Sequence, residues 1–167
     1  MEHLMLRFSD SLSEQWFNHV MKDWRPKTGN IVFIPCASKK PYWTSVTHRS
    51  FFGRLWNLWF KGRIDLVVLS EPLTAVPADY DYPFAKYPLY DYPPSTLKKN
   101  VREQEIWRKR LDLFLSKLNG KRKYAVLYQY HQNVLGNILR KHGVFTLYTQ
   151  RPYIAKTVRK LLKVIIA

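Results

Sequence analysis

The alternation of apolar and polar positions divides the chain into short strands and amphipathic helices. Four continuous apolar runs predict buried strands, at residues 30–35, 64–70, 123–129 and 144–149. Apolar residues at helical spacing predict helices near residues 9–23, 51–62, 95–118, 133–143 and 154–165. Apolar strands separated by helices are typical of a parallel sheet covered on both sides. We therefore predict one three-layer α/β domain over residues 1–167, with a mainly parallel sheet of about four strands.

Residues 71–94 interrupt this alternation. They contain six prolines and five tyrosines. Because proline supplies no backbone N–H, we expect neither a helix nor a central strand there. Much of the scarce acid also lies in this segment, including Glu71, Asp79, Asp81 and Asp91. Two interpretations stay open: a packed loop with solvated acids, or a binding segment whose tyrosines stack on unpaired bases.

The order of the elements places the loops that follow the strands. In an open α/β sheet, ligands bind beyond the carboxyl ends of the strands, where the strand order reverses. The loops 36–50, 71–74 and 129–133 each follow a predicted strand. We expect these loops to lie on one edge of the sheet, with Gln129 and His131 near the first of them.

Charge narrows the class of partner. The chain has 28 Lys and Arg against 12 Asp and Glu, a net charge of +16, and no acid follows Asp112. Such a balance is typical of proteins that bind nucleic acids, although a merely basic solvated surface is the alternative. The expected RNA contacts are Lys121, Arg122, Lys123, Lys156, Arg159 and Lys160.

Several classes of protein are excluded or disfavoured. No run of about 18 apolar residues is present, so we expect no membrane span. The acid and polar residues of the N-terminus do not match a secretory signal, and we expect a cytoplasmic protein. The single cysteine, Cys36, excludes an internal disulfide and a cysteine-rich zinc site. We predict neither a metal nor a cofactor.

The loop "PCASKKPYWTSVTHRS" (35–50) concentrates reactive groups without a carboxylate. Cys36 is a candidate nucleophile, because the nearby cations Lys39, Lys40 and His48 would favour its thiolate. His48 suits proton transfer near neutral pH. The structural alternatives are a packing role for Cys36 and phosphate binding by the two lysines.

The spacing of residues within this loop resembles the signature of a known protein family. Pro35-Cys36, Lys40-Pro41-Tyr42, Ser45 and His48 match a PC-x3-KPY-x2-S-x2-H signature, which resembles that of archaeosine synthase, a family related to the tRNA-guanine transglycosylases. A second stretch is similar to the family through Ser70, Pro72, Leu73, Val76, Pro77, Tyr82, Pro83 and Tyr87. The chain departs from the family at Glu71 and Thr74, where small residues are usual.

The resemblance implies a fold, a substrate and an activity. The fold implied is similar to that of uracil-DNA glycosylase, with a family-like core at about residues 30–150. The substrate implied is tRNA that carries a 7-cyano-7-deazaguanine base, and the reaction adds an amine, from free lysine, to its nitrile. Cys36 would attack first as a thiolate, or the amine would attack directly, with Lys40 stabilising the anion and His48 donating a proton. Further candidates for substrate binding are Pro35, Lys39, Tyr42, Ser45, Ser70, Glu71, Gln129 and His131.

Three functions are consistent with these observations. The first is an enzyme, or enzyme subunit, of archaeosine-type tRNA modification. The second is a non-catalytic RNA-binding module that delivers tRNA to a separate transglycosylase. The third, a DNA glycosylase, is disfavoured because "PCASKKPYW" has no Asp, Asn or Glu to position a water molecule.

Overall fold

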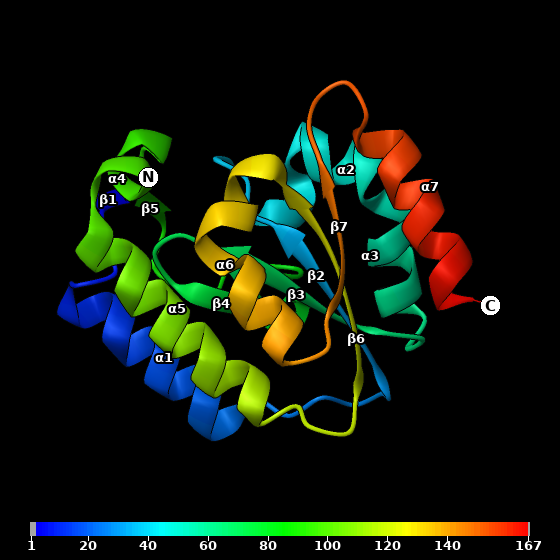
Figure 1. Ribbon diagram of the computed structural model, residues 1–167, viewed down its shortest axis with the longest axis horizontal. Coiled ribbons are helices and arrows are strands. Elements are labelled where there is room, and N and C mark those ends of the chain that lie inside the picture. Colours follow the sequence, from blue (N-terminus) through cyan, green and yellow to red (C-terminus); the bar gives the residue numbers. More distant parts are fainter. Residues whose placement is uncertain (1–2, 167) are drawn as a thin grey trace.

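The computed structural model describes residues 3–166 and is built on a five-stranded sheet (Figure 1). The strand order is β4-β3-β2-β6-β7. The strands are β2 (Asn30–Pro35), β3 (Asp65–Ser70), β4 (Thr74–Pro77), β6 (Arg122–Tyr128) and β7 (Phe145–Thr149). All neighbours pair in parallel except β3 and β4, which are antiparallel. The mostly parallel α/β sheet predicted from the apolar runs is therefore present.

The sequence predicts about four strands, and the sheet has five. The strand that was not predicted is β4, which lies inside the proline-rich segment. It occupies an edge of the sheet, where Pro77 is tolerated since a missing N–H there breaks no inner ladder. Thr74, its first residue, has a φ of +73°. This left-handed conformation is unfavourable for a β-branched side chain and favours glycine, which agrees with the small residue usual in the resembled family.

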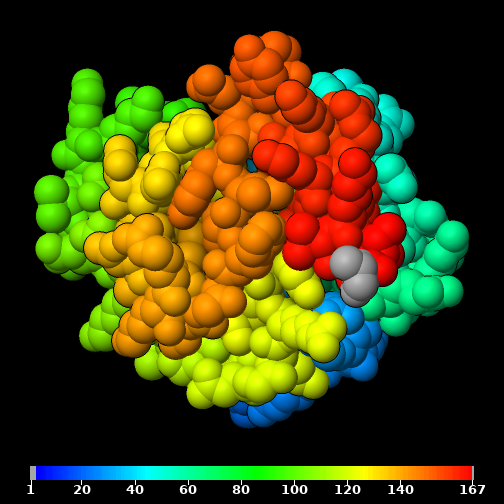
Figure 2. Space-filling model, turned by 45° about the vertical axis from the view of Figure 1, so that its right-hand side comes forward, coloured from blue at the N-terminus to red at the C-terminus, as the bar shows by residue number. Residues whose placement is uncertain are grey.

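Helices cover both faces of the sheet (Figure 1). On one face lie α1 (Ser11–Asp23), α5 (Val101–Ser116) and α6 (Gln129–Lys141). The other face is covered by α2 (Val46–Phe51), α3 (Gly53–Phe60) and α7 (Ile154–Ile165). In the space-filling view α7, in red, lies beside the segment of α2 and α3 (Figure 2). The sheet with helices on both faces forms the three layers that the sequence predicts.

Three predicted helices have different boundaries. The helix expected at 51–62 is shorter and corresponds to α3, and a separate helix that was not expected, α2, precedes it. Ser45 caps α2 by accepting a hydrogen bond from the His48 amide, and Phe52 separates the two helices. The helix expected at 95–118 is divided into α4 (Pro94–Lys99) and α5, whose cap is Asn100. The helix expected from residue 133 begins at Gln129, immediately after β6.

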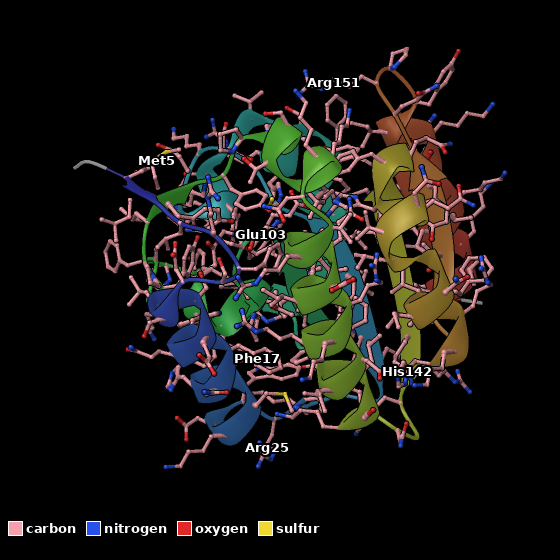
Figure 3. The ribbon with its side chains drawn as sticks, turned by 60° about the vertical axis from the view of Figure 1, so that its left-hand side comes forward. Met5, Phe17, Arg25, Glu103, His142 and Arg151 are labelled. Carbon is pink, nitrogen blue, oxygen red and sulfur yellow. The ribbon has the colours of Figure 1, made fainter. Side chains whose placement is uncertain are left out.

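The N-terminal segment is attached to α5 by a buried carboxylate. Glu103 accepts hydrogen bonds from the backbone amides of Phe8, at 2.7 Å, and Ser9, at 3.1 Å (Figure 3). Nearby, β1 (Leu4–Met5) pairs in parallel with β5 (Tyr90–Asp91). This small sheet fixes the end of the proline-rich segment beside the carboxyl edge of the main sheet.

Within residues 3–166, no helix combines the length and the apolar character that crossing a membrane requires.

Candidate functional site

The strand order reverses between β2 and β6, and the loops that follow the strands meet there. After β2 the chain passes to β3 on one side, whereas after β6 it passes to β7 on the other. Cys36, Glu71 and Gln129 directly follow β2, β3 and β6. The expectation that these loops share one edge is confirmed, because His131 contacts Glu71 at 2.9 Å and both Cys36 and Glu71 line one cleft.

Two clefts flank Cys36. We call the first the tyrosine cleft; it has a volume of about 350 Å³ and is lined chiefly by Cys36, Lys40, Glu71, Tyr90, Tyr92 and Tyr130. We call the second the basic cleft; it has a volume of about 400 Å³ and its lining includes Cys36, Lys39, Thr47, Tyr128 and Arg151. Arg151 extends from the loop before α7 at this edge (Figure 3). The first cleft thus has two acids, Glu71 and Asp91, and one cation, Lys40, among aromatic rings, and the second has two cations.

Glu71 and His131 form a buried pair at the tyrosine cleft. The His131 Nδ1 accepts a hydrogen bond from the Tyr128 amide at 3.1 Å. Its Nε2 therefore carries the proton and donates to Glu71 Oε1 at 2.9 Å. The other oxygen, Oε2, lies 3.4 Å from the Tyr130 hydroxyl. This arrangement orients the carboxylate and leaves Oε2 weakly engaged beside the cleft.

Lys40 brings a cation into the same cleft. Its Nζ donates to the carbonyls of Ser38, at 3.0 Å, and Tyr90, at 2.9 Å, and lies 3.9 Å from the centre of the Tyr90 ring. Two of its three N–H groups are thereby used, so the third is available to a ligand. Burial lowers the pKa of Lys40, which makes its ammonium a better proton donor.

The Cys36 thiol is protonated, contrary to the expected thiolate. Burial raises its pKa to about 12, and the Glu71 carboxylate acts in the same direction. Lys40 lowers this pKa by a smaller amount. The loop sequence contains no acid, but the fold brings Glu71 beside the sulfur, and desolvation disfavours the anion further.

His48 does not reach either cleft, so the structure contradicts its expected role as a proton donor. The ring is fully buried, with Nε2 donating to the Pro35 carbonyl at 2.8 Å. Its Nδ1 accepts a hydrogen bond from the Trp56 indole at 3.2 Å. Burial lowers the pKa of His48 to about 4. The imidazole is neutral and connects the end of β2 to α3.

Three other predicted substrate contacts are structural. Tyr42 is fully buried, and its hydroxyl lies 2.5 Å from that of Tyr90, so its ring cannot stack on a base. The Ser70 hydroxyl lies 2.7 Å from the same Tyr90 hydroxyl. Ser45 caps α2, which is the structural alternative expected of a hydroxyl before a helix. Tyr42 and Ser70 form the floor beneath the site, whereas Ser45 also lines the basic cleft.

Asp81 is a buried residue whose role the sequence did not reveal. Its carboxylate accepts hydrogen bonds from the amides of Tyr42, at 2.8 Å, and Trp43, at 3.0 Å, and from the Tyr87 hydroxyl. It therefore holds the Lys40-Pro41-Tyr42 turn in place. The only signal in the sequence was its position among tyrosines, which does not specify a partner 39 residues away.

The basic residues are divided among different parts of the surface. Lys156, Arg159 and Lys160 are exposed on α7. Lys121 and Arg122 lie at the amino end of β6, on the edge opposite the clefts. The prediction that Lys123 contacts RNA is wrong, because this residue is buried and its Nζ donates to the Lys121 carbonyl at 3.0 Å. Its ammonium is thus directed to the protein rather than to a phosphate.

The remaining predicted residues lie at the carboxyl edge or close to it. Lys39 and Gln129 are exposed at this edge, and the Pro35 carbonyl accepts the His48 hydrogen bond. Asp79 lies away from the tyrosine cleft, where it accepts a hydrogen bond from the Trp24 indole at 2.9 Å. Across residues 3–166, no group of three or more His, Cys, Asp and Glu side chains is arranged to hold a metal ion.

Comparisons with known proteins concern the fold and the family of this chain. The fold is similar to the crystal structure of AF0587, a protein of unknown function, with a TM-score of 0.63 over 91% of this chain and 50% of that chain, at 19% identity. Two curated relatives are named archaeosine synthase subunit alpha. The one from Methanosarcina acetivorans is 26% identical over 74% of this chain, and the one from Thermoplasma acidophilum is 26% identical over 72%.

The chain spans about a fifth of the length of these curated relatives, 19% and 21% respectively. A family model described as a domain of unknown function, DUF5591, matches residues 13–165. This match includes the whole main sheet and the helices on both of its faces. The chain therefore belongs to the DUF5591 family.

Proposed function

We propose that this protein takes part in archaeosine-related tRNA modification, adding an amine to the nitrile of a 7-cyano-7-deazaguanine base in tRNA. The similarity to two archaeosine synthase alpha subunits supports the general process. The observation that carries the chemical part is the tyrosine cleft, which combines the Glu71 carboxylate and the Lys40 ammonium between aromatic rings. Free lysine is the amine donor that we propose.

The proposed reaction adds one N–H across the C≡N bond and needs no oxidant or reductant. The amine arrives protonated, and Glu71 accepts its proton so that the nitrogen lone pair becomes available. The nitrogen then bonds to the nitrile carbon while one π bond of the nitrile breaks. Lys40 donates a proton to the nitrile nitrogen, and the proton released by the attacking nitrogen restores it. The product amidine takes up the proton held by Glu71 and leaves as an amidinium, so both Glu71 and Lys40 return to their starting states.

The direct test is mass spectrometry of tRNA that carries the cyano base, after incubation with this protein and isotopically labelled lysine. A separate transglycosylase-related protein is added in a second arm, because the curated relatives are about five times longer than this chain. A labelled nucleoside, heavier by one lysine, is the expected result. If neither arm yields it, the protein is better described as a non-catalytic RNA-binding module.

Cys36 provides a second prediction, since a thiol with a pKa of about 12 is an inefficient nucleophile near neutral pH. We expect Cys36→Ser to retain turnover within about threefold, because direct attack by the amine does not use the sulfur. Alkylation of Cys36 by iodoacetamide should still accelerate between about pH 9 and pH 11, without the plateau that a free cysteine shows. A turnover loss of about a hundredfold or more in Cys36→Ser would instead support covalent attack.

The basic face of α7 provides a third prediction. If Lys156, Arg159 and Lys160 bind phosphates, replacing all three by Ala should weaken tRNA binding. The slope of log Kd against log salt concentration should also fall by about one for each phosphate interaction that is removed. Exposed Lys22 on α1 and Lys109 on α5, replaced by Ala, provide the matched control. An equal effect of the control variant would show that α7 has no specific role.

The RNA-binding module remains the second candidate function, and a specific observation favours it. The Cys36 thiol is protonated and His48 is buried and neutral, so neither residue is suited to the role in covalent attack or proton donation that the sequence suggested. A docking surface requires neither group. We also propose the uracil-DNA-glycosylase-like relationship of the fold, which is consistent with the central parallel sheet and the site at its carboxyl edge.

A further inference from the structure

An aromatic cleft lies on the face covered by α2 and α3, and the proposed reaction does not use it. We call it the tryptophan cleft; it has a volume of about 280 Å³ and is lined by Trp43, Trp56, Trp59, Phe60 and Tyr82, together with Arg49, Gly53 and Asn57. Its lining and that of the tyrosine cleft have no described residue in common. Phe60, at its rim, is 69% exposed.

The rings of the tryptophan cleft are held in a defined arrangement. Tyr82 is contacted edge-to-face by Trp43, Trp59 and Phe60, with ring centres 5.1 to 5.8 Å apart. The Trp43 indole donates to the Pro83 carbonyl at 3.1 Å, and the Trp56 indole donates to His48. Since these two N–H groups already have partners, what the cleft offers a ligand is mainly aromatic surface.

A second cleft, lined by arginines, adjoins the first. It has a volume of about 360 Å³ between the α2–α3 segment and α7, and Arg49, Arg54 and Arg159 all line it. It shares Arg49 and Gly53 with the tryptophan cleft. The two sides of this cleft lie next to each other in the space-filling view (Figure 2). Among residues 3–166, no acid lines either cleft.

We propose that the two adjoining clefts bind an unpaired nucleotide of single-stranded RNA, with its base in the tryptophan cleft and its phosphate on Arg49, Arg54 and Arg159. Base stacking on aromatic rings beside a basic groove is how proteins bind single strands without reading sequence. Three arginines without an acid attract the negatively charged phosphate diesters of an RNA strand, whereas an apolar peptide segment would gain nothing from them. The proposal rests on the RNA-binding part of the proposed function and adds a binding position remote from the reacting base.

The test uses a fluorescently labelled, unmodified single-stranded RNA of about ten nucleotides, measured by anisotropy at low salt. Phe60→Ala and Trp59→Leu remove stacking surface, and Arg49→Gln with Arg54→Gln removes the charges that would bind phosphate. Each change is expected to weaken binding by about 5- to 100-fold, and the arginine double variant should also reduce the salt dependence. Quenching of tryptophan fluorescence by the RNA should be reduced in Trp59→Leu, because Trp43 and Trp56 remain in the cleft.

Matched controls separate these effects from misfolding and from general charge. Phe145→Ala removes an exposed ring from β7, and Lys98→Gln with Lys99→Gln removes two charges from α4. Both controls should bind like the wild type, and all variants should keep the wild-type melting temperature within a few degrees. Phe60→Ala carries the test if Trp59→Leu unfolds, because the Phe60 ring is largely exposed.

Two outcomes would overturn the inference. One is unchanged affinity in Phe60→Ala and in the arginine double variant. The other is no single-strand binding by the wild type at low salt, which would assign the aromatic surface to a protein partner. Glu71→Gln should bind this RNA normally, because Glu71 lies in the other cleft. Loss of RNA binding and loss of modification are therefore measured separately, so either proposal can fail without the other.

Discussion

Glu71→Gln is expected to abolish most amine transfer while leaving the fold and the affinity for tRNA unchanged. Glutamine has nearly the same shape, and its amide oxygen can accept the hydrogen bond from His131 Nε2, which lies 2.9 Å from Glu71 Oε1. What is lost is the group that takes the proton from the incoming ammonium. General-base catalysis contributes about 100- to 10,000-fold, so we expect a rate reduction of that order.

The measurement is the rate of labelled lysine incorporation into tRNA that carries the cyano base, at saturating tRNA. Glu105→Gln, an exposed residue of α5, is the matched control and should keep the wild-type rate. The resembled family usually has a small residue at position 71, so the experiment also decides whether this chain uses a base of its own. An unaffected rate in Glu71→Gln would leave the carboxylate as a packing partner of His131.

His48→Ala is expected to be the most destabilising change in the loop motif of residues 35–48, through stability rather than proton transfer. It leaves the Pro35 carbonyl and the Trp56 indole N–H without their partners inside the protein and opens a cavity. Together these effects should lower the free energy of unfolding at pH 7 by about 2–4 kcal/mol. Chemical denaturation of the wild type and the variant measures the difference.

The same residue should make stability depend on pH with a definite sign. The pKa of His48 is lowered from 6.5 to about 4, so the unfolded chain takes up the proton more readily than the folded protein. Its stabilising contribution is therefore complete above pH 6.5 and is lost as the pH falls towards 4. A shift of this size corresponds to about 3 kcal/mol.

The difference in stability between the wild type and His48→Ala should accordingly shrink as the pH falls from 6.5 to 4. His19→Ala is a suitable control, because the His19 side chain is 48% exposed and pairs with Asp23 on the surface of α1. A change of the same size in the control would mean that the effect is not specific to the buried imidazole of His48. A constant difference for His48→Ala would mean that the imidazole is not held neutral by burial.

Local patterns were enough to predict most of the main sheet and its site edge. The apolar runs of β2, β3, β6 and β7 predict strands because each must exclude polar side chains from both covered faces. Parallel strands place their following loops at one edge, so the proximity of Glu71 and His131 to Cys36 was expected. The fifth strand was missed because two prolines lie close to Thr74–Ala75–Val76, and only an edge position makes them acceptable.

The chemical state of the site was decided by tertiary structure. The loop 35–50 has lysines and a histidine beside Cys36, which in isolation favours a thiolate. Folding instead places the partly buried Cys36 next to Glu71 and turns His48 towards Trp56. The burial of a side chain and the charges close to it depend on residues that are far apart in the chain. Motif spacing in the sequence therefore does not predict their effect on a pKa. By itself the sequence determined most of the elements of the main sheet, the basic character and the edge at which the reactive groups meet. Only the folded arrangement decided which of those groups are charged, which are exposed and which serve as the floor, because desolvation acts through space and not along the chain.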